Sequence, residues 1–467
     1  MNVSADVKNA YKTNSITKHI TLYFPELGIT VGTSELYSET LSLSESLVDS
    51  DSIEFVGCIA SKFKVNVHGL HVDVKGKKLE VKICTDGTEE EPVPLFRGIV
   101  DSAMKQSNKQ IKEIVAYDEL YTKGNTEVSA WYKSLAFPVT LKDLRDSLFA
   151  YIGLGQAEAS LPNDGSSIKK QYAPNSLQAL SVIKAVCQIN GVFGIINRQG
   201  IFEYRVLGNI EEDESIYPSE TLFPGNDVFP TDPNIAMAQA ERIAEGIEAE
   251  YFSFYRRVEY EEYKVKPIDK VTIRQSDEDA GTTYGTGINN YIIQGNMFTY
   301  GLKETELAEI AKNVHESIGG FSYYPFRSDN NGLPFIECGL DAVSYYVVDW
   351  ENSTGGEIVY EEKSFYILNR ELTGTQALKD SYSAQGEEYQ TEFITDLQTQ
   401  IDILKKNGGA NVQTQIEDYT YSKSEIDGMF SGGGGDGGIA NIVLVDHLPP
   451  DADSNTLYVV KGEVVVD

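Results

Sequence analysis

The sequence predicts a mainly β fold with an α+β insert and a short C-terminal coiled-coil stalk. Three observations support this: alternation of apolar and polar residues typical of strands, a central segment with apolar residues at helical spacing, and a seam-like spacing near the C-terminus. The composition agrees, because 28 Tyr, 19 Phe and 40 Gly suit strands separated by tight turns. A chain of 467 residues is too long for one ordinary core and should form three or four domains.

Residues 1–125 form the first predicted β domain. Apolar residues occupy every second position over 63–67 and again over 79–83, with a turn expected at Lys75-Gly76-Lys77 between these strands. A further strand pair is expected over 96–104 and 110–117. The pattern fits an antiparallel sandwich or barrel and does not separate the two.

Residues 126–206 form a predicted helix-hairpin (α+β) insert. Thr140 followed by Asp143 resembles a capping box, and a helical stripe follows. That stripe consists of Leu141, Leu144, Leu148 and Ile152. A second helix should begin near Asn175 or Ser176, and Gly191 suits its C-terminal cap. The segment Asn197-Arg198-Gln199-Gly200 then predicts the turn of a β-hairpin.

Residues 207–390 are predicted to be rich in strands, with one clear helix. The apolar face of that helix consists of Leu307, Ile310, Ala311, Val314 and Ile318. The Gly-rich segment GTTYGTG at 281–287 lacks the Lys-Ser/Thr ending of a phosphate-binding loop, and a plain loop is expected there.

Residues 391–430 are predicted to form a helical, coiled-coil stalk. The seam residues Ile394, Leu397, Ile401 and Leu404 follow a spacing of three, four and three. Two turns of seam are marginal by themselves, so a single amphipathic surface helix is the alternative. Residues 431–467 combine a Gly-rich linker with a predicted β-hairpin attachment segment over 456–460 and 463–466.

The charge balance excludes several partners. The formal net charge is -32, which argues against a protein that grips nucleic acid or an anionic membrane. The excess serves either solubility or a wall along which DNA slides without adhering. We expect no secretory signal at the polar N-terminus and no stable membrane insertion, because the sequence has no run of 18 apolar residues.

No catalytic or metal-binding pattern stands out. His68 and His71 have HxxH spacing, but no third ligand accompanies them in the sequence. The four cysteines are scattered in apolar stretches and suit small buried thiols. There is no GxSxG motif. We therefore predict no enzyme, no catalytic residue, no cofactor and no metal.

The order of segments resembles the tail-hub, or baseplate-hub, family of tailed phages and related contractile injection systems. The family includes the N-terminal hub module of tail-associated lysins and tail-tip proteins of siphophages. The segments that carry the resemblance are SESLVDSDSIEFVGCIASKFKVNV, PLFRGIVDSAMKQSNKQIKEIVAYDELY, SLQALSVIKAVCQINGVFGIINRQGIFEYR, FYILNRELTGTQALKDSYSAQGEEYQ and YTYSKSEIDGMF. These segments are spread between residues 44 and 430, and it is their joint order rather than any single motif that carries the resemblance.

The resemblance implies two related hub-type β barrels, in 1–125 and in 207–390, and a homotrimer that docks on a six-fold tail ring. The implied role is a virion structural protein at the tail tip, which closes the tail tube and serves host attachment and DNA ejection. Implied partners are a distal tail or tail tube ring protein, a tape measure protein, and a fibre or receptor-binding protein at the C-terminus.

Two alternatives remain open at the level of sequence: a tail-associated cell-wall hydrolase and a bacterial surface adhesin. The lysin-bearing members of the family carry a hydrolase domain after the stalk, and we expect none here because the sequence ends at Asp467. A siphophage tail, a contractile particle and a tail-like bacteriocin fit the sequence equally well, and the host and its receptor are not specified.

Overall fold

The computed structural model describes residues 3–13, 16–48, 57–106, 110–169, 175–207, 249–251, 255–276, 279–349, 353, 359–389, 441–445 and 456–460. The chain separates into two compact units, Met1–Thr399 and Gln400–Asp467. The first unit is mainly β and contains a large antiparallel sheet, which confirms the predicted β-rich class. None of the helices in the described ranges is long and apolar enough to cross a membrane.

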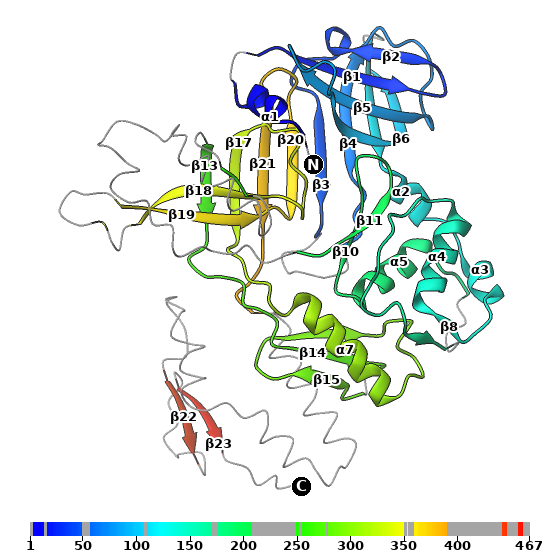
Figure 1. The fold of residues 1–467 in the computed structure, drawn as a ribbon, viewed down its shortest axis with the longest axis vertical. Coiled ribbons are helices and arrows are strands. Elements are labelled where there is room, and N and C mark those ends of the chain that lie inside the picture. Colours follow the sequence, from blue (N-terminus) through cyan, green and yellow to red (C-terminus); the bar gives the residue numbers. More distant parts are fainter. Residues whose placement is uncertain are drawn as a thin grey trace. The chain divides into compact units, whose positions relative to one another are not determined.

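An eleven-stranded sheet organises the first unit (Figure 1). In spatial order its strands are β13 (Tyr255–Tyr260), β17 (Phe326–Asn331), β21 (Lys379–Ala384), β20 (Asn369–Thr373), β3 (Ser42–Ser46), β4 (Lys62–His68), β7 (Ile111–Tyr117), β6 (Val93–Lys105), β5 (Lys78–Thr85), β1 (Lys18–Phe24) and β2 (Ile29–Gly32). Strand β3 pairs antiparallel with β20, whose residues lie more than 300 positions later in the chain. The two predicted β regions therefore share one sheet.

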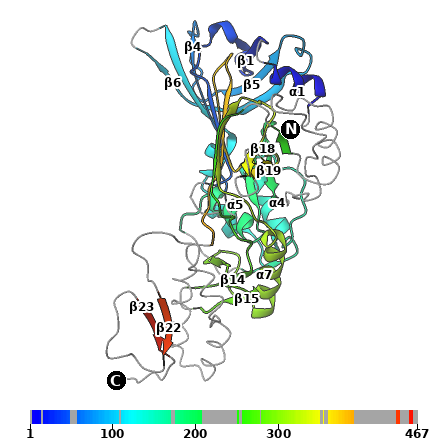
Figure 2. The same cartoon turned by 90° about the vertical axis from the view of Figure 1, so that its left-hand side faces the viewer.

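The strands of the first β region follow the predicted alternation. Phe63, Val65 and Val67 of β4 are buried while their neighbours are exposed or half-buried, because successive side chains of a strand point to opposite faces. The short 3₁₀ helix η1 (Thr33–Glu35) then leads from β2 to Leu36, which forms a bridge with Val67. This contact brings the end of the β1–β2 pair back to β4. Helix α1 (Ala5–Lys12) packs beside β5 (Figure 2).

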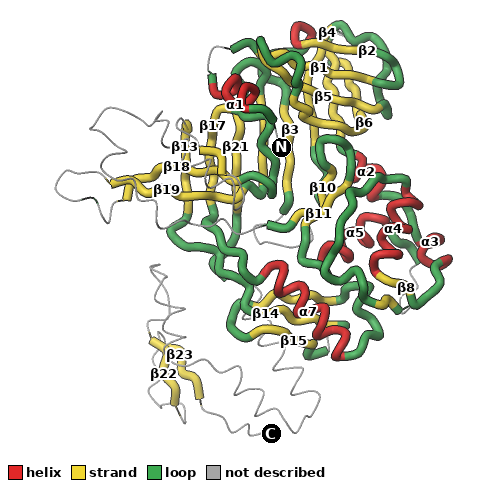
Figure 3. The backbone as a smooth tube through the Cα atoms, viewed as in Figure 1, coloured by secondary structure: helices red, strands yellow, loops and turns green. Residues whose placement is uncertain are grey.

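The insert gathers most of the helices (Figure 3). Its elements are α2 (Glu119–Gly124), α3 (Ser129–Ser134), β8 (Val139–Thr140), α4 (Leu141–Ile152), β9 (Ser167–Ile168), α5 (Ala179–Gln188), β10 (Phe193–Ile196) and β11 (Phe202–Arg205). The predicted cap of α4 is confirmed, since the backbone N–H of Asp143 donates to Thr140 Oγ1 at 3.1 Å. The predicted hairpin is also present as β10–β11, with Gly200 at a φ of 80° in its turn.

Helix α5 begins later than the sequence suggested. Leu177 and Ser176 precede the helix, because their polar groups are used elsewhere: the Leu177 carbonyl accepts from Val128 N at 2.7 Å and its N–H donates to Glu127. The predicted cap at Gly191 is confirmed: the helix ends at Gln188, Gly191 follows with a φ of 62°, and its N–H donates to the carbonyl oxygen of Gln188 at 3.2 Å.

The second β region adds two smaller sheets. One consists of β12 (Ala249–Tyr251), β18 (Ala342–Asp349) and β19 (Val359–Tyr366), and the other of β15 (Thr282–Gly285), β14 (Lys270–Arg274) and β16 (Asn290–Gln294). The β18–β19 hairpin runs across the large sheet (Figure 1), and Tyr345 of β18 donates a hydrogen bond to Ser328 of β17 at 2.8 Å. Helix α7 (Glu304–Ile318) buries the whole predicted apolar face. It also contacts the insert, where Asn313 donates to Asn163 at 2.8 Å.

The loop expected over 281–287 is in part a strand. Strand β15 pairs antiparallel with β14. Gly281 and Gly285 have φ angles of 86° and 93°, and a Cβ on Gly285 would lie 2.3 Å from the carbonyl oxygen of Asp269. These glycines therefore permit a close approach of two strands, whereas the sequence pattern predicted a plain loop.

The second unit contributes a parallel strand pair, β22 (Asn441–Val445) and β23 (Thr456–Val460). The strand over 456–460 is as predicted and pairs with β22; the predicted hairpin partner over 463–466 lies outside the described residues. In the described residues, the strands of 207–390 divide among the large sheet and the two smaller sheets, and the arrangement as two related barrels stays a prediction.

Candidate functional site

Three neighbouring strands of the large sheet each place one ionisable side chain on the buried face. These residues are Glu45 in β3, Arg370 in β20 and Asp380 in β21, and all three are at most 7% exposed. They alternate with buried apolar residues of the same face, such as Leu43 and Leu372. Glu45 and Arg370 lie directly opposite each other across the β3–β20 pair.

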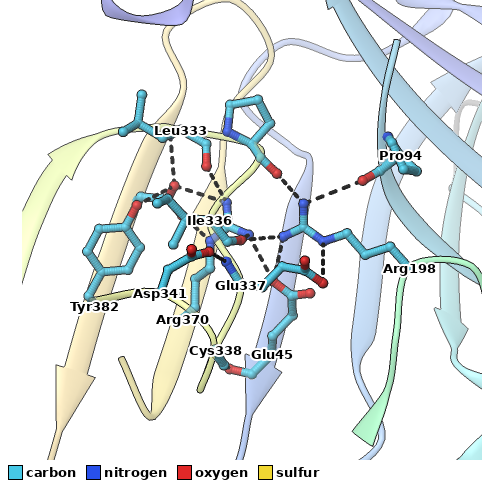
Figure 4. A network of polar contacts seen from close by, with 12 residues as sticks. Glu45, Pro94, Arg198, Leu333, Ile336, Glu337, Cys338, Asp341, Arg370 and Tyr382 are labelled. Carbon is cyan, nitrogen blue, oxygen red and sulfur yellow. Dashed lines mark hydrogen bonds and ion pairs between the residues drawn. The ribbon is translucent and has the colours of Figure 1, made fainter. Parts of the chain in front are cut away.

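Arg370 is the centre of this buried charge network (Figure 4). Its Nε and one terminal nitrogen donate to both oxygens of Asp380 at 2.8 and 3.0 Å, a forked geometry that suits a carboxylate. The other terminal nitrogen donates to Glu45 Oε2 at 2.9 Å. Backbone carbonyls of Leu333 and Ile336 accept at 3.0 and 2.6 Å. All five N–H donors of the guanidinium group therefore have acceptors available.

Arg198 brings the insert into the same network. It lies in the turn of the β10–β11 hairpin and is 5% exposed. Its guanidinium group donates to Glu45 Oε2 at 3.2 Å and to the carbonyl oxygen of Ile336 at 2.5 Å. Carbonyl oxygens of Pro334 and Pro94 also accept from it. One carboxylate, that of Glu45, thus joins an arginine of the insert to an arginine of the sheet.

A second arginine of the hairpin extends the contact. Arg205 donates to the carbonyl oxygen of Cys338 and forms ion pairs with Glu203 at 2.6 Å and Glu337 at 3.4 Å. Burial alone would raise the pKa of Glu337, but the charges of Arg198 and Arg205 hold it below its usual value. Glu337 therefore stays ionised at neutral pH.

These charges are suited to holding segments together rather than to moving protons. Burial by itself would lower the pKa of Arg370, but Asp380 and Glu45 raise it well above its usual value. A permanently charged guanidinium group with fully used donors neither gives up nor takes a proton at neutral pH. Breaking one partner would leave an uncompensated charge in the interior, so the network fixes the insert, the loop over 333–341 and the sheet in one arrangement.

A separate buried arginine organises the interior of the insert. Arg145 of α4 donates to both oxygens of Asp164 at 2.9 and 2.8 Å and to the carbonyl oxygen of Ala159 at 2.7 Å. Its guanidinium carbon lies 5.5 Å from the ring centroid of Tyr204 in β11. This arginine therefore links α4, the segment after it and the hairpin that carries Arg198.

The residues singled out in the sequence have different outcomes. The stalk residues Ile394, Leu397, Ile401 and Leu404 lie outside the described residues. His68 Nε2 is hydrogen-bonded to the carbonyl oxygen of Ser34 at 2.9 Å, and His71 is exposed.

The cysteines and the potential metal ligands also differ in part from the prediction. Cys58, Cys187 and Cys338 are buried as predicted, whereas Cys84 is only half-buried. Among the described residues, His19, Asp86 and Glu89 bring three potential metal-ligand atoms together.

Sequence reasoning missed the buried charge network, although part of its signal is visible in the sequence. Glu45 lies between Leu43 and Leu47, and Arg370 lies between Leu368 and Leu372, in each case at the apolar phase of the alternation. A charged residue at such a position predicts a buried, paired charge. The sequence holds no corresponding signal for Arg198, because turn residues are ordinarily solvated.

Comparisons with known proteins give only structural neighbours. No protein-family model matches the sequence, and no curated protein matches it. Solved structures that resemble the chain include a 43 kDa tail protein of prophage MuSo2 from Shewanella oneidensis, with 10% identity and a TM-score of 0.46. That comparison covers 79% of this chain and 98% of the Shewanella chain.

Two further tail proteins are similar. One is from Neisseria meningitidis MC58, with 12% identity, a TM-score of 0.42 and coverage of 80% of this chain and 98% of the other. The second is prophage tail protein gp18 from Listeria monocytogenes EGD-e, with 11% identity, a TM-score of 0.41 and coverage of 83% and 99%. At these identities and TM-scores the likeness is loose, and the proposals below rest on the residues of this chain.

Proposed function

We propose that the chain is a structural protein of a phage tail or phage-tail-like particle, and that it acts as the hub at the tail tip. The observation that carries the proposal is the arrangement of the resembling segments: a first β region, a helix-hairpin insert and a second β region that share one sheet. The buried contacts of Arg198, Glu45 and Arg370 join all three of these regions.

A buried charge network that links three regions suits a protein that bears mechanical load. A tail tip must keep its parts in register while other components pull on it, and buried ion pairs resist rearrangement because separating them exposes unpaired charge. The sheet adds to this, because strands from both ends of the first unit are hydrogen-bonded side by side. The insert is thereby attached to the scaffold at its hairpin turn rather than only through its two chain connections.

The finer proposal is a homotrimer that docks on a six-fold tail ring. Two β regions per copy would present six related surfaces in a trimer, which would reconcile three-fold with six-fold symmetry. Partners in this arrangement would be a distal tail or tube ring protein, a tape measure protein and a fibre or receptor-binding protein. The net charge of -32 supports a surface along which DNA passes without adhering.

The proposal is tested by locating the chain in its parent particle. Antibodies raised against residues 126–206 should label one end of the tails in electron micrographs, and three copies should be counted per particle by quantitative mass spectrometry against the tube protein. Label along the whole tube or on the capsid would contradict the tip position. Absence of the chain from purified particles would contradict the structural role itself.

The hydrolase alternative is tested with the same purified chain. Under the structural proposal, cell-wall zymograms with peptidoglycan from several Gram-positive and Gram-negative bacteria show no clearing. Clearing that disappears when one acidic residue is replaced by its amide would identify an enzyme and overturn this part of the proposal.

A further inference from the structure

Two of the cysteines meet in the interior, between the first β region and the insert. Cys58 lies in the segment that leads into β4, and Cys187 lies in the last turn of α5. Their sulfur atoms are 3.6 Å apart, although the two residues are separated by 129 positions in the sequence. Both residues are at most 3% exposed. The function proposed above makes no use of this pair.

The backbone around both cysteines is held by strand β10 and the residue before it. The N–H of Gly194 donates to the carbonyl oxygen of Gly57 at 2.9 Å, and Cys58 forms a parallel bridge with Gly194. The carbonyl oxygen of Cys187 accepts from the N–H of Val192, directly before β10, at 3.1 Å. Because the same short segment holds both cysteines, the fold itself brings their side chains together.

The packing around Cys58 leaves its sulfur close to Cys187. Gly194 has no side chain, and a Cβ there would lie 2.7 Å from the Cys58 sulfur, so this sulfur lies directly against the backbone of β10. A thiol is only a weak hydrogen-bond donor and acceptor, so the contact between the two sulfur atoms gains little as a hydrogen bond. Its chemical possibility is oxidation, for which the sulfur atoms must approach from 3.6 Å to about 2.05 Å.

We infer that Cys58 and Cys187 form an intramolecular disulfide bond when the chain meets a small external disulfide of the oxidised-glutathione type. In the first step the Cys58 thiolate attacks oxidised glutathione, forms a mixed disulfide and releases one reduced glutathione. In the second step the Cys187 thiolate attacks the Cys58 sulfur and releases the other reduced glutathione. The two cysteines lose two electrons and two protons, and one oxidised glutathione takes up both to become two thiols.

Burial makes the reaction slow in the folded chain. An external disulfide reaches neither sulfur atom without local opening of the interior. Burial also raises the pKa of Cys187, so little of its reactive thiolate form is present. The bond should therefore form fastest while the chain folds, and once formed it should be shielded from external reductants for the same reason.

The bond would attach the insert to the first β region covalently. It would join α5 to the segment before β4, whereas the ion pair of Arg198 with Glu45 joins the hairpin turn to β3. A cross-link between residues 129 positions apart closes a long loop and so restricts the unfolded chain. We therefore expect the oxidised chain to be more stable than the reduced chain.

The test uses the full chain with Cys84→Ser as the parent, because Cys84 is half-buried and could link separate chains. One sample is refolded from urea with oxidised glutathione, and a second is incubated with it for days in the folded state. After quenching with acid and N-ethylmaleimide, the free thiols should fall from three to one, since the parent keeps three of the four cysteines. Peptide mapping should find Cys58 joined to Cys187, and the unfolding temperature should exceed that of the reduced chain by at least about 3 °C.

Two further variants of this parent separate the pair from ordinary buried thiols. Cys187→Ala should lose the stabilisation by oxidised glutathione. The matched control is Cys338→Ala, because Cys338 is also buried but its sulfur contacts the carbonyl oxygen of Glu45 at 3.6 Å, and this variant should still form the bond. Three free thiols in both samples, a bond that involves Cys338, or glutathione that remains attached to Cys58 would overturn the inference. A lower unfolding temperature of the oxidised chain would overturn the stabilising role.

Discussion

Arg370 is completely enclosed, and its environment explains why an arginine rather than a lysine occupies the position. The planar guanidinium group meets Asp380 with two parallel bonds and still reaches Glu45 on the adjacent strand. A lysine ammonium group could keep the charge but not this forked geometry. Asp380 has its second support from the Tyr382 hydroxyl group, which donates to it at 2.9 Å.

Replacing Arg370 with methionine should therefore be strongly destabilising. Two carboxylates, those of Asp380 and Glu45, would remain buried without their cation, and we expect a loss of about 3–5 kcal/mol in the free energy of unfolding. The free energy of unfolding of Arg370→Lys should lie between those of the parent chain and Arg370→Met. The measurement is urea denaturation of each variant, followed by fluorescence.

A matched control is Arg257→Met. Arg257 is also an arginine of the large sheet and pairs with Glu259, but its side chain is 60% exposed, so the change should have little effect. Equal stability of Arg370→Met and Arg257→Met would show that the buried network contributes nothing.

Asp118 gives the fold a specific pH dependence. Its carboxylate caps α2 by accepting from Leu120 N at 2.9 Å and accepts from Ser61 N at 2.6 Å, and burial raises its pKa to about 7. The folded chain therefore keeps this proton up to about pH 7, whereas the unfolded chain loses it near pH 4. Between those values the unfolded state binds fewer protons, so rising pH lowers the stability that this group contributes, by up to about 1.4 kcal/mol per pH unit.

Asp118→Asn should remove that slope. The amide keeps one acceptor oxygen for the cap and has no proton to lose, so the difference in stability between about pH 5 and about pH 8 should be smaller than in the parent chain. Urea midpoints of both proteins at the two pH values measure this. A slope unchanged by the substitution would mean that Asp118 is ionised throughout the range.

At the scale of elements, the β10–β11 hairpin is attached by its turn. A hairpin alone is only marginally stable, and this one gains its fixed position from Arg198 and Arg205, which reach the loop over 333–341. The aromatic contact of Phe202 with Phe149 of α4, at 4.9 Å between ring centroids, holds the other side.

Arg198→Ala should free the hairpin turn while leaving the rest of the insert folded. Hydrogen–deuterium exchange should rise in peptides covering 193–205 and in the loop over 333–341, because both lose the guanidinium contacts that join them. Gln199→Ala is the control in the same turn, since the side chain of Gln199 is exposed. Equal exchange rates in Arg198→Ala and Gln199→Ala would mean that other contacts hold the hairpin turn in place.

The elements show where sequence reasoning succeeds and where it fails. The strands β4 to β7 and the helices α4 and α7 were predictable, because each has a long, regular apolar period of its own. The start of α5 was not, since the Glu127 carboxylate and the backbone N–H of Val128, both from a distant segment, bind the residue before it. Local patterns could not predict the β3–β20 pairing either, because the two strands lie more than 300 positions apart in the sequence.

The candidate site divides in the same way. Glu45 and Arg370 occupy positions of the strand alternation where apolar residues are expected, so the sequence could identify them as buried charges. Arg198, which completes the contact, comes from a turn and could not be identified in this way. The group formed by His19 and Asp86 could not be found by spacing, because its members meet only when β1 pairs with β5.

At the scale of the whole molecule, charge and assembly are linked. Each chain carries a formal charge of -32, so bringing three copies together raises the electrostatic free energy of the assembly. Salt screens this repulsion over a Debye length of about 8–10 Å at 0.10–0.15 M ionic strength. A trimer of this chain should therefore become more populated as the salt concentration rises, which mass photometry at several salt concentrations would detect.

The predicted seam of Ile394, Leu397, Ile401 and Leu404 gives the sharpest test of the trimer. Leu397→Asp would place a carboxylate from each copy in an apolar seam, so trimers should dissociate at lower dilution than those of the parent chain. Thr399→Asp is the control, because it adds the same charge at a position between the seam residues. Two turns of seam are weak alone, and the hub regions should supply the rest of the association. If Leu397→Asp and Thr399→Asp form trimers equally well, the segment is a surface helix and the three copies meet elsewhere.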